Sequence, residues 1–308
     1  MAEHEANRPS IDVSLLPDAS LTEIDFRDTS FFQSKGTEQA ELPSPEEIIQ
    51  QYPDLRGRGI AKFEQLNLVV KTDHSNYLRT EEALTLRAIR QAFPSNEVPV
   101  PEVFGWRKVG TRVYIYMGLV SGKTLRQAWD SLTSTDKASI RDQLSQIIAA
   151  LRRITQGSPA RFIGSVNGGH VQDRFFKLDY EEGPFFSIKS FNDWMGAAAT
   201  RQKPGQEGFQ RDVYRDFVAD TGEIYFTHGD LTLGNIIISD GDSPRRIVGI
   251  IDWEQAGWYP EYWEYCKLLY AVDYEHGWRS EGWAEQVMKQ YEEEWEAFGE
   301  YSHWRGCP

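Results

Sequence analysis

The sequence predicts an α+β fold with two lobes, a small strand-rich lobe followed by a larger and mainly helical one. Strand-like residues concentrate at positions 59–120, and amphipathic helical spacing dominates after them. A second strand-like stretch appears late, at 223–252. Because strands and helices are segregated rather than alternating, the pattern does not predict a βαβ chain. We expect an N-terminal extension over residues 1–45, a small lobe over 46–118 and a large lobe over 119–308.

Composition excludes several classes of protein. The 308 residues are 40% hydrophobic and 13% aromatic, which is enough apolar material for a substantial core. With 33 basic and 47 acidic residues the net charge is −14, which argues against nucleic acid or an anionic membrane surface as partner and favours cationic small molecules. The sequence has no apolar run long enough to span a membrane, a polar start, and only Cys266 and Cys307. We therefore expect a reducing, cytoplasmic compartment.

The first hundred residues predict an anchored extension and then a small sheet. Residues 24–26 and 31–32 are the apolar segments expected to anchor the extension, and a short helix is expected at 46–51, after Pro45. A hairpin is predicted over 60–63 and 66–71. The small lobe continues with a helix at 80–92, an extended X-Pro run at 98–101 and a strand at 112–120.

The second half predicts a helical lobe with strands inserted late. Residues 135–155 carry an apolar stripe at helical spacing, formed by Ile140, Leu144, Ile147, Ile148, Leu151 and Ile154. Further helices are expected near 191–200, 208–219 and 261–305. Within 223–252, the runs 235–239 and 246–251 flank a turn centred near residue 243 and predict a hairpin.

This hairpin brings together the residues with the strongest chemical signal. An even register about residue 243 would make Asn235 and Asp252 cross-strand neighbours at the open end, with Asp230 in the loop just before it. A carboxylate with an amide oxygen suits Mg²⁺, which prefers oxygen ligands. A second carboxylate, Asp230, would remain to orient or deprotonate a hydroxyl, as phosphoryl transfer requires. A lone His-Gly-Asp turn, or an aspartate at the end of a strand, is common in ordinary structure. The joint spacing of Asp230, Asn235 and Asp252 favours a functional role.

The motifs resemble those of the aminoglycoside phosphotransferase family. His228-Gly229-Asp230 with Asn235 five positions after the aspartate matches the spacing of the kinase catalytic loop, and Asp252-Trp253-Glu254 stands at the metal-binding position. The stretches 163–166, 183–185 and 228–270 look most like the fungal-type branch, and the resemblance covers residues 42–295. It implies a protein-kinase-like fold, ATP (or GTP) with Mg²⁺ as cofactors, and phosphorylation of a small molecule. In that fold an acidic residue at position 264 braces the catalytic loop.

The small lobe should supply the nucleotide contacts. Lys71 ends a predicted buried strand, as the phosphate-binding lysine of kinases does, although a solvent-facing strand end is the ordinary alternative. Glu82 shares a helix face with apolar residues and is the expected partner of Lys71, with Glu81 as the alternative. Met117 and Leu119 belong to the expected hinge, where the backbone would bind the purine, and core packing is an equal alternative for Met117.

Some features of the chain leave the function open. No glycine-rich loop precedes Lys71, and only Gly57 and Gly59 could shape a phosphate-covering turn. Glu254, Tyr259 and Glu261 would either line an acceptor pocket or begin the next helix. We predict an ATP-dependent phosphotransferase that acts on an aminoglycoside-like, choline-like or other metabolite hydroxyl. The alternative is a catalytically inactive, kinase-like nucleotide- or metabolite-binding protein. A protein kinase is disfavoured because no activation-loop signature follows the metal-binding motif, and no oligomeric state is predicted.

Overall fold

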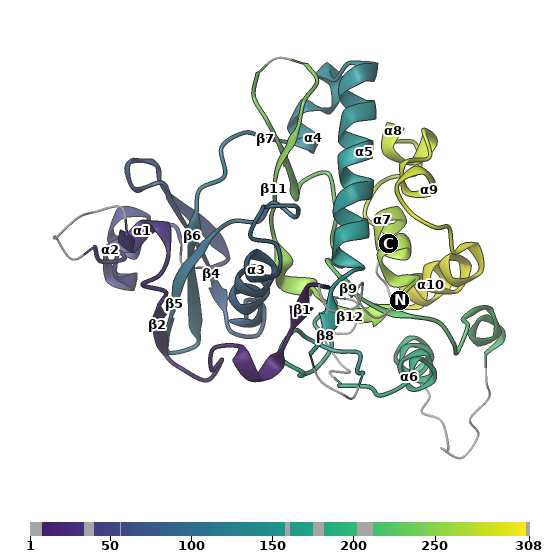
Figure 1. Ribbon diagram of the computed structural model, residues 1–308. Coiled ribbons are helices and arrows are strands. Elements are labelled where there is room, and N and C mark those ends of the chain that lie inside the picture. The colour runs from purple at the N-terminus through teal and green to yellow at the C-terminus, as the bar shows by residue number, and fades with distance from the viewer. Residues whose placement is uncertain are drawn as a thin grey trace.

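The computed structural model describes residues 8–33, 40–55, 57–157, 161–174, 182–201, 212–241 and 243–305. Two lobes lie side by side, a sheet with flanking helices on the left of Figure 1 and a mainly helical lobe on the right. Most of the small lobe comes from the first part of the chain, and the C-terminal helices lie on the far side of the large lobe. The predicted order of a strand-rich lobe before a helical one is confirmed.

A five-stranded antiparallel sheet forms the small lobe. Its strands, in sheet order, are β2 (Glu23–Asp25), β5 (Val103–Val109), β6 (Arg112–Gly118), β4 (Leu68–His74) and β3 (Gly59–Phe63). Strand β5 was not predicted, and β4 extends three residues beyond the predicted end at Lys71. Lys71 therefore lies inside a central strand, opposite Ile115, where flanking strands bury it.

The N-terminal segment is tied to this sheet as expected. Ile24 lies in β2, which pairs with β5, and Phe26 and Phe31 are buried against core aromatics. Short helices α1 (Ser30–Gln33) and α2 (Pro45–Gln51) follow. Ser44 and Glu47 form a capping box, which satisfies free backbone N–H groups at the start of α2.

Helix α3 (Glu81–Ala92) connects the small lobe to the large one. Its buried face includes Glu82, Leu86 and Ile89, the face that the spacing predicted. The helix contacts β5 of the sheet and also the short 3₁₀ helix η5 (Trp253–Gln255) of the large lobe. The carboxylate of Glu82 is thereby held between the sheet and the segment that follows Asp252.

The large lobe is built around α5 (Ser134–Leu151), which a Thr133 capping box starts. Every member of the predicted apolar stripe is buried, although the helix ends at Leu151 rather than 155. The other α-helices of the lobe are α4 (Leu125–Ala128), α6 (Ile188–Thr200), α7 (Trp263–Tyr270), α8 (Gly277–Ser280), α9 (Trp283–Val287) and α10 (Glu292–Trp304). The helix predicted at 208–219 is wrong in its described part, where Val213–Phe217 is a 3₁₀ helix; 208–211 lie outside the described residues.

Small sheets in the large lobe position the loop that contains Asp230 and the residues up to Asp252. The predicted hairpin is present as β10 (Ile236–Ile238) and β11 (Ile247–Ile250), and β7 (Lys123–Thr124) pairs with β10. The remaining strands are β1 (Ser10–Ile11) with β8 (Thr155–Gln156), and β9 (Ile224–Thr227) with β12 (Gly257–Pro260). Cys266 is a buried free thiol in α7, whereas Cys307 lies outside the described residues. Among the described helices, none is long and apolar enough to cross a membrane.

Candidate active site

The loop between β9 and β10 is held in place through the conformation of Gly229 and through hydrogen bonds from its backbone to Glu264. Gly229 has φ of +74°, and a Cβ atom there would lie 2.9 Å from the carbonyl oxygen of Gln255, so glycine is required. The backbone N–H groups of His228 and Gly229 donate to Oε2 of Glu264, at 2.7 and 3.4 Å. Glu264 thus braces the loop, as the resemblance implied.

The His228 ring connects this loop to the end of the hairpin. Burial lowers the pKa of His228 to about 4, so the imidazole is neutral at pH 7. Its Nδ1 accepts the backbone N–H of Asp230 at 3.1 Å, and its Nε2 lies 3.1 Å from the carbonyl oxygen of Ile251. Nε2 therefore carries the proton, and the ring positions the loop rather than exchanging protons.

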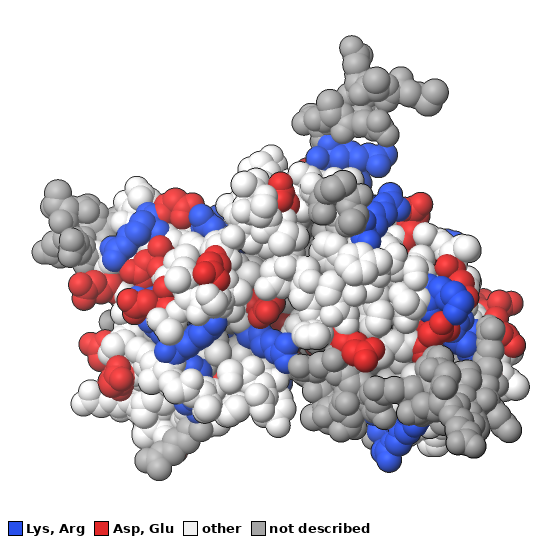
Figure 2. Space-filling view, turned by 90° about the horizontal axis from the view of Figure 1, so that it is seen from below, with Lys and Arg blue, Asp and Glu red and all other residues white. Residues whose placement is uncertain are grey.

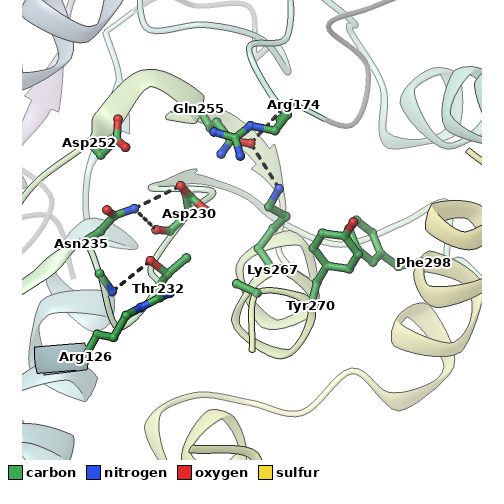
Figure 3. Close-up of a pocket in the computed structure, with 12 residues that line it drawn as sticks. Arg126, Arg174, Asp230, Thr232, Asn235, Asp252, Gln255, Lys267, Tyr270 and Phe298 are labelled. Atoms are coloured by element: carbon green, nitrogen blue, oxygen red, sulfur yellow. Dashed lines mark hydrogen bonds between the residues drawn. The ribbon is translucent and has the colours of Figure 1, made fainter. Parts of the chain in front are cut away.

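Asp230 faces Asn235 across the loop. The amide nitrogen of Asn235 donates to the Asp230 backbone carbonyl at 2.8 Å and to its carboxylate Oδ2 at 3.1 Å, as Figure 3 shows. Burial raises the pKa of Asp230 to about 6, although the ammonium of Lys267 partly opposes the effect. The carboxylate is ionised at pH 7 and has a basicity suited to accepting a proton.

Asp252 lies on the other side of Asn235, but in a different register from the one predicted. Ile236 pairs with Ile250, so Asn235 is opposite Ile251, whose N–H donates to the Asn235 carbonyl at 2.9 Å. The even register about residue 243 was wrong by one position. Asp252 itself adopts a left-handed conformation with φ of +66°, which re-aims the chain as the hairpin ends. Such backbone strain in a non-glycine residue is concentrated at functional sites.

The predicted ion pair between Lys71 and Glu82 is present. Nζ of Lys71 lies 2.7 and 3.0 Å from the two Glu82 carboxylate oxygens, contacts Oδ1 of Asp252 and lies 3.5 Å from Glu254. Burial opposes the charge on Lys71, but the three carboxylates more than compensate and raise its pKa above the ordinary value. The alternative partner Glu81 instead accepts a hydrogen bond from Asn167, at 3.3 Å.

The carboxylate of Asp252 remains charged in this network. Burial alone would raise its pKa, but Lys71 and Arg58 lower it below the ordinary value. Nη2 of Arg58 lies 3.6 Å from Asp252 and 3.3 Å from Glu254. Glu82, Asp252 and Glu254 are close enough to one another to hold a metal ion, yet the cation among these three carboxylates is the Lys71 ammonium.

The donor atoms of Asn235 and Asp252 suit a magnesium site. The Asn235 amide nitrogen is used by Asp230, and no hydrogen bond from the described residues reaches its Oδ1. Figure 3 places Asp252 and Asn235 across from each other at one end of the pocket. An amide oxygen beside an ionised carboxylate is a donor set that hard divalent cations prefer.

Two cavities meet at these residues. The first, of about 420 Å³, lies between the lobes and includes Lys71, Glu82, Met117 and Leu119 in its lining. The backbone N–H of Leu119 donates to the carbonyl of Asn67 at 3.1 Å, so the expected purine contact through this N–H is not available in the structure. Met117 and Leu119 line the cavity nonetheless, and Met117 is buried within the strand pairing of β6.

The second cavity, of about 390 Å³, opens beside Asp230 in the large lobe. Its lining includes the cationic residues Arg126, Arg174 and Lys267 and the aromatic residues Tyr270 and Phe298, shown in Figure 3. None of the five was predicted as a site residue from the sequence. The sequence indicated only that Lys267 and Tyr270 lie on the same side of a helix, because residues three apart share a helix face.

The three residues considered for an acceptor pocket lie elsewhere. Glu254 lies in η5 and contacts Lys71, Arg58 and Arg174. Tyr259 is buried in β12, and Glu261 stands between β12 and α7. The described lining beside Asp230 contains none of the three.

A model of APH, the phosphotransferase enzyme family, matches residues 62–301. The chain belongs to this family. A solved GDP complex of wild-type aminoglycoside 2'-phosphotransferase-IIIa is 14% identical with a TM-score of 0.50, covering 83% of this chain and 87% of that one. A GDP complex of a mutant of the same enzyme is 15% identical with a TM-score of 0.51, covering 83% and 85%. These structures confirm the kinase-like fold. Among curated proteins no sequence matches the chain, and the fungal-type branch stays a prediction.

Proposed function

We propose that this phosphotransferase-family protein transfers the γ-phosphoryl group of ATP or GTP to a hydroxyl group of a small molecule. The observation that carries the proposal is the meeting of two cavities at Gly234, Asn235 and Asp252, which line both. Lys71 lines the first cavity and Asp230 the second. A phosphoryl donor in one and an acceptor in the other would have their reacting ends at the shared wall.

The cavity between the lobes suits a nucleotide. Residues 46–118 would act as the nucleotide-binding lobe, and Met117 and Leu119 would contact the base through their side chains. Lys71, held by Glu82, would bind the nucleotide phosphates, and a fixed ammonium group at that position lowers the cost of bringing several negative charges together. The two solved relatives with this fold bind GDP, which supports a purine nucleotide here.

Asn235 and Asp252 would hold Mg²⁺, which when bound neutralises charge on the transferred phosphoryl group. Asp230 would orient the acceptor hydroxyl and take its proton. The hydroxyl oxygen forms a bond to the γ-phosphorus, and the bond from that phosphorus to the β,γ-bridging oxygen breaks, releasing ADP or GDP. The hydrogen bonds from Asn235 hold the carboxylate of Asp230 in place for this step.

Transfer from labelled ATP or GTP to a panel of hydroxyl metabolites, with Mg²⁺, tests the proposal. We expect Asp230→Asn to reduce turnover by about 10²- to 10⁴-fold, the usual contribution of a positioned general base, while nucleotide binding is retained. Asp240→Asn is the matched control, since Asp240 is exposed on the hairpin and lines neither cavity. Nucleotide binding with no transfer to any acceptor would favour the inactive binding protein, and no nucleotide binding at all would overturn both.

A further inference from the structure

The cavity beside Asp230 has a charge that the whole protein does not share. The chain carries a net charge of −14, and on the face shown in Figure 2 acidic and basic side chains are interspersed over both lobes. The cavity lining instead contains the cations Arg126, Arg174 and Lys267 against the carboxylates Asp230 and Asp252. What a cavity binds depends on the groups within a few ångströms, because solvent screens more distant charges.

The three cations differ in how far they are already neutralised. Nζ of Lys267 is buried and lies 3.0 Å from a carboxylate oxygen of Asp173. Nη2 of Arg174 lies 3.3 Å from the Glu254 carboxylate. Arg126 has no ion pair among the described residues. It therefore remains the cation with most capacity for a ligand.

The fold places Arg126 at the catalytic loop. It lies on α4, next to the Thr124 capping box, and its backbone N–H donates to the carbonyl of Leu233 at 2.9 Å. A Cβ atom at Gly234 would lie 3.8 Å from Nε of Arg126, an ordinary van der Waals distance, so the guanidinium lies beside the loop. Figure 3 shows Arg126 beside Thr232, at the end of the pocket opposite Arg174.

The two carboxylates of this lining leave little to attract a cationic acceptor. Asp252 is already bound by Lys71 and lies 3.6 Å from Arg58. Asp230 is partly compensated, since Lys267 and Arg174 both lower its pKa against the larger effect of burial. A polycation would bring several more positive charges beside Arg126, Arg174 and Lys267, and only one lining carboxylate, Asp230, has no ion pair among the described residues.

One part of the cavity wall is apolar. Tyr270 on α7 and Phe298 on α10 lie edge to face, with ring centroids 5.6 Å apart, and Ala271 adjoins them. A ligand that combined an apolar portion with one anionic group would match both ends of the lining. Planar guanidinium groups bind carboxylates and phosphates in the same forked geometry.

We propose that the acceptor is an anionic hydroxy compound whose oxyanion group binds Arg126 and whose apolar portion packs against Tyr270. Its hydroxyl would then face Asp230. This inference rests on the proposed phosphotransfer for the role of the hydroxyl, but the charge preference of the cavity can be measured by binding alone. It differs from the expectation of a cationic acceptor that the net charge favoured.

Three probes on one phenylpropane skeleton, each with a hydroxyl on C2, isolate charge: 3-phenyllactate, 3-phenylpropane-1,2-diol and 1-amino-3-phenylpropan-2-ol, which are anionic, neutral and cationic at pH 7.5. Their dissociation constants are measured by calorimetry on the full chain, with and without Mg²⁺ and a non-hydrolysable ATP analogue. We expect the acid to bind at least tenfold more tightly than the amine, with a difference that shrinks as salt rises. Glycerol phosphate and glycerate, compared in the same way, distinguish a phosphate from a carboxylate ligand.

Arg126→Gln should remove most of the preference for the acid while the nucleotide analogue binds as before, and Arg126→Lys should retain part of it. Arg246→Gln is the matched control, because Arg246 is exposed on the hairpin and lines neither cavity. Equal or tighter binding of the amine, binding of none of the probes, or an Arg126→Gln protein that still prefers the acid would each overturn the inference. If the native protein bound no nucleotide, the proposed phosphotransfer would be overturned instead, so the two failures are distinguishable.

Discussion

The two cavities of this protein differ in how their charges are arranged. In the cavity between the lobes, the Lys71 ammonium is buried among Glu82, Asp252 and Glu254, and all four groups come from elements that pack against one another. In the cavity of the large lobe, Arg126 is exposed and has no ion pair among the described residues. The first arrangement is a closed network on which the fold depends. The second arrangement leaves the charge of Arg126 available for a ligand, so we expect a substitution of Arg126 to have little effect on the stability of the fold.

The largest effect on stability is expected from breaking the closed network. Lys71→Met leaves Glu82 buried without its counterion and should lower the free energy of unfolding by about 3–5 kcal/mol. It should also abolish thermal stabilisation by Mg-ATP, which is about 2.7 kcal/mol at a hundredfold excess over Kd. Chemical denaturation and thermal shift measure the two effects.

A second substitution separates stability from binding. Lys71→Met with Glu82→Gln should recover much of the lost stability, because no buried carboxylate of α3 is left unpaired, but not the response to Mg-ATP. Lys123→Met is the surface control: Lys123 pairs with Asp240 at 3.5 Å with both side chains more than half exposed, and its loss should cost under about 1 kcal/mol. An equal loss in the free energy of unfolding for Lys71→Met and Lys123→Met would contradict the view that the fold depends on the buried network.

The closed network was also the more predictable of the two regions. Lys71, Glu82 and the loop from His228 to Asn235 lie in short segments where strand ends, helix spacing and motif spacing carry information. The register of the hairpin was missed by one residue because the position of the turn does not fix which residues pair. Ile238 lies opposite Ile247, and the irregularity between Ile237 and Ile238 shifts the outer pairs toward the predicted register, not away from it.

The residues that line the cavity beside Asp230 could not be predicted for a different reason. Arg126, Arg174, Lys267 and Phe298 come from four separate parts of the chain, and only tertiary packing brings them to one cavity. Each is an ordinary residue in its own segment, since charged side chains are common on helices and in loops. The missed strand β5 differs from these residues, because its partner β6 follows it directly, with Val109 opposite Arg112, and only its pairing with β2 joins segments distant in sequence.

A smaller effect is expected from pH, through the carboxylate of Asp230, the proposed general base. Since burial raises the pKa of Asp230 to about 6, turnover should fall about tenfold per unit as the pH decreases below about 6. The folded state binds this proton more tightly than the unfolded state, whose aspartate titrates near 3.8, so protonating Asp230 does not itself destabilise the fold. Initial rates at pH 5–8 with circular dichroism at each pH measure the effect; a rate that is flat down to pH 5 would contradict it.

The smallest effect is expected for Glu264→Gln, a change to the buried carboxyl group that braces the loop between β9 and β10. Its Oε2 accepts the His228 N–H at 2.7 Å, whereas its Oε1 has no hydrogen-bond partner among the described residues, and burial raises its pKa to about 7. Glu264→Gln keeps an acceptor for the loop without a buried charge, so its free energy of unfolding should stay within about 1 kcal/mol of native. Glu264→Ala, which leaves the N–H unpaired, should lose about 1–3 kcal/mol.

The pH dependence distinguishes the brace from ordinary packing. The folded pKa of Glu264 lies above its unfolded value near 4.5, so its contribution to stability is greatest at low pH and falls as the pH rises through about 7. The Gln variant lacks this proton, and its stability relative to the native protein should therefore increase from pH 5.5 to pH 8. Urea denaturation of both proteins at the two pH values measures the difference. A constant difference would mean that the Glu264 carboxyl does not titrate in this range, and the loop would then be braced by a carboxylate that stays ionised.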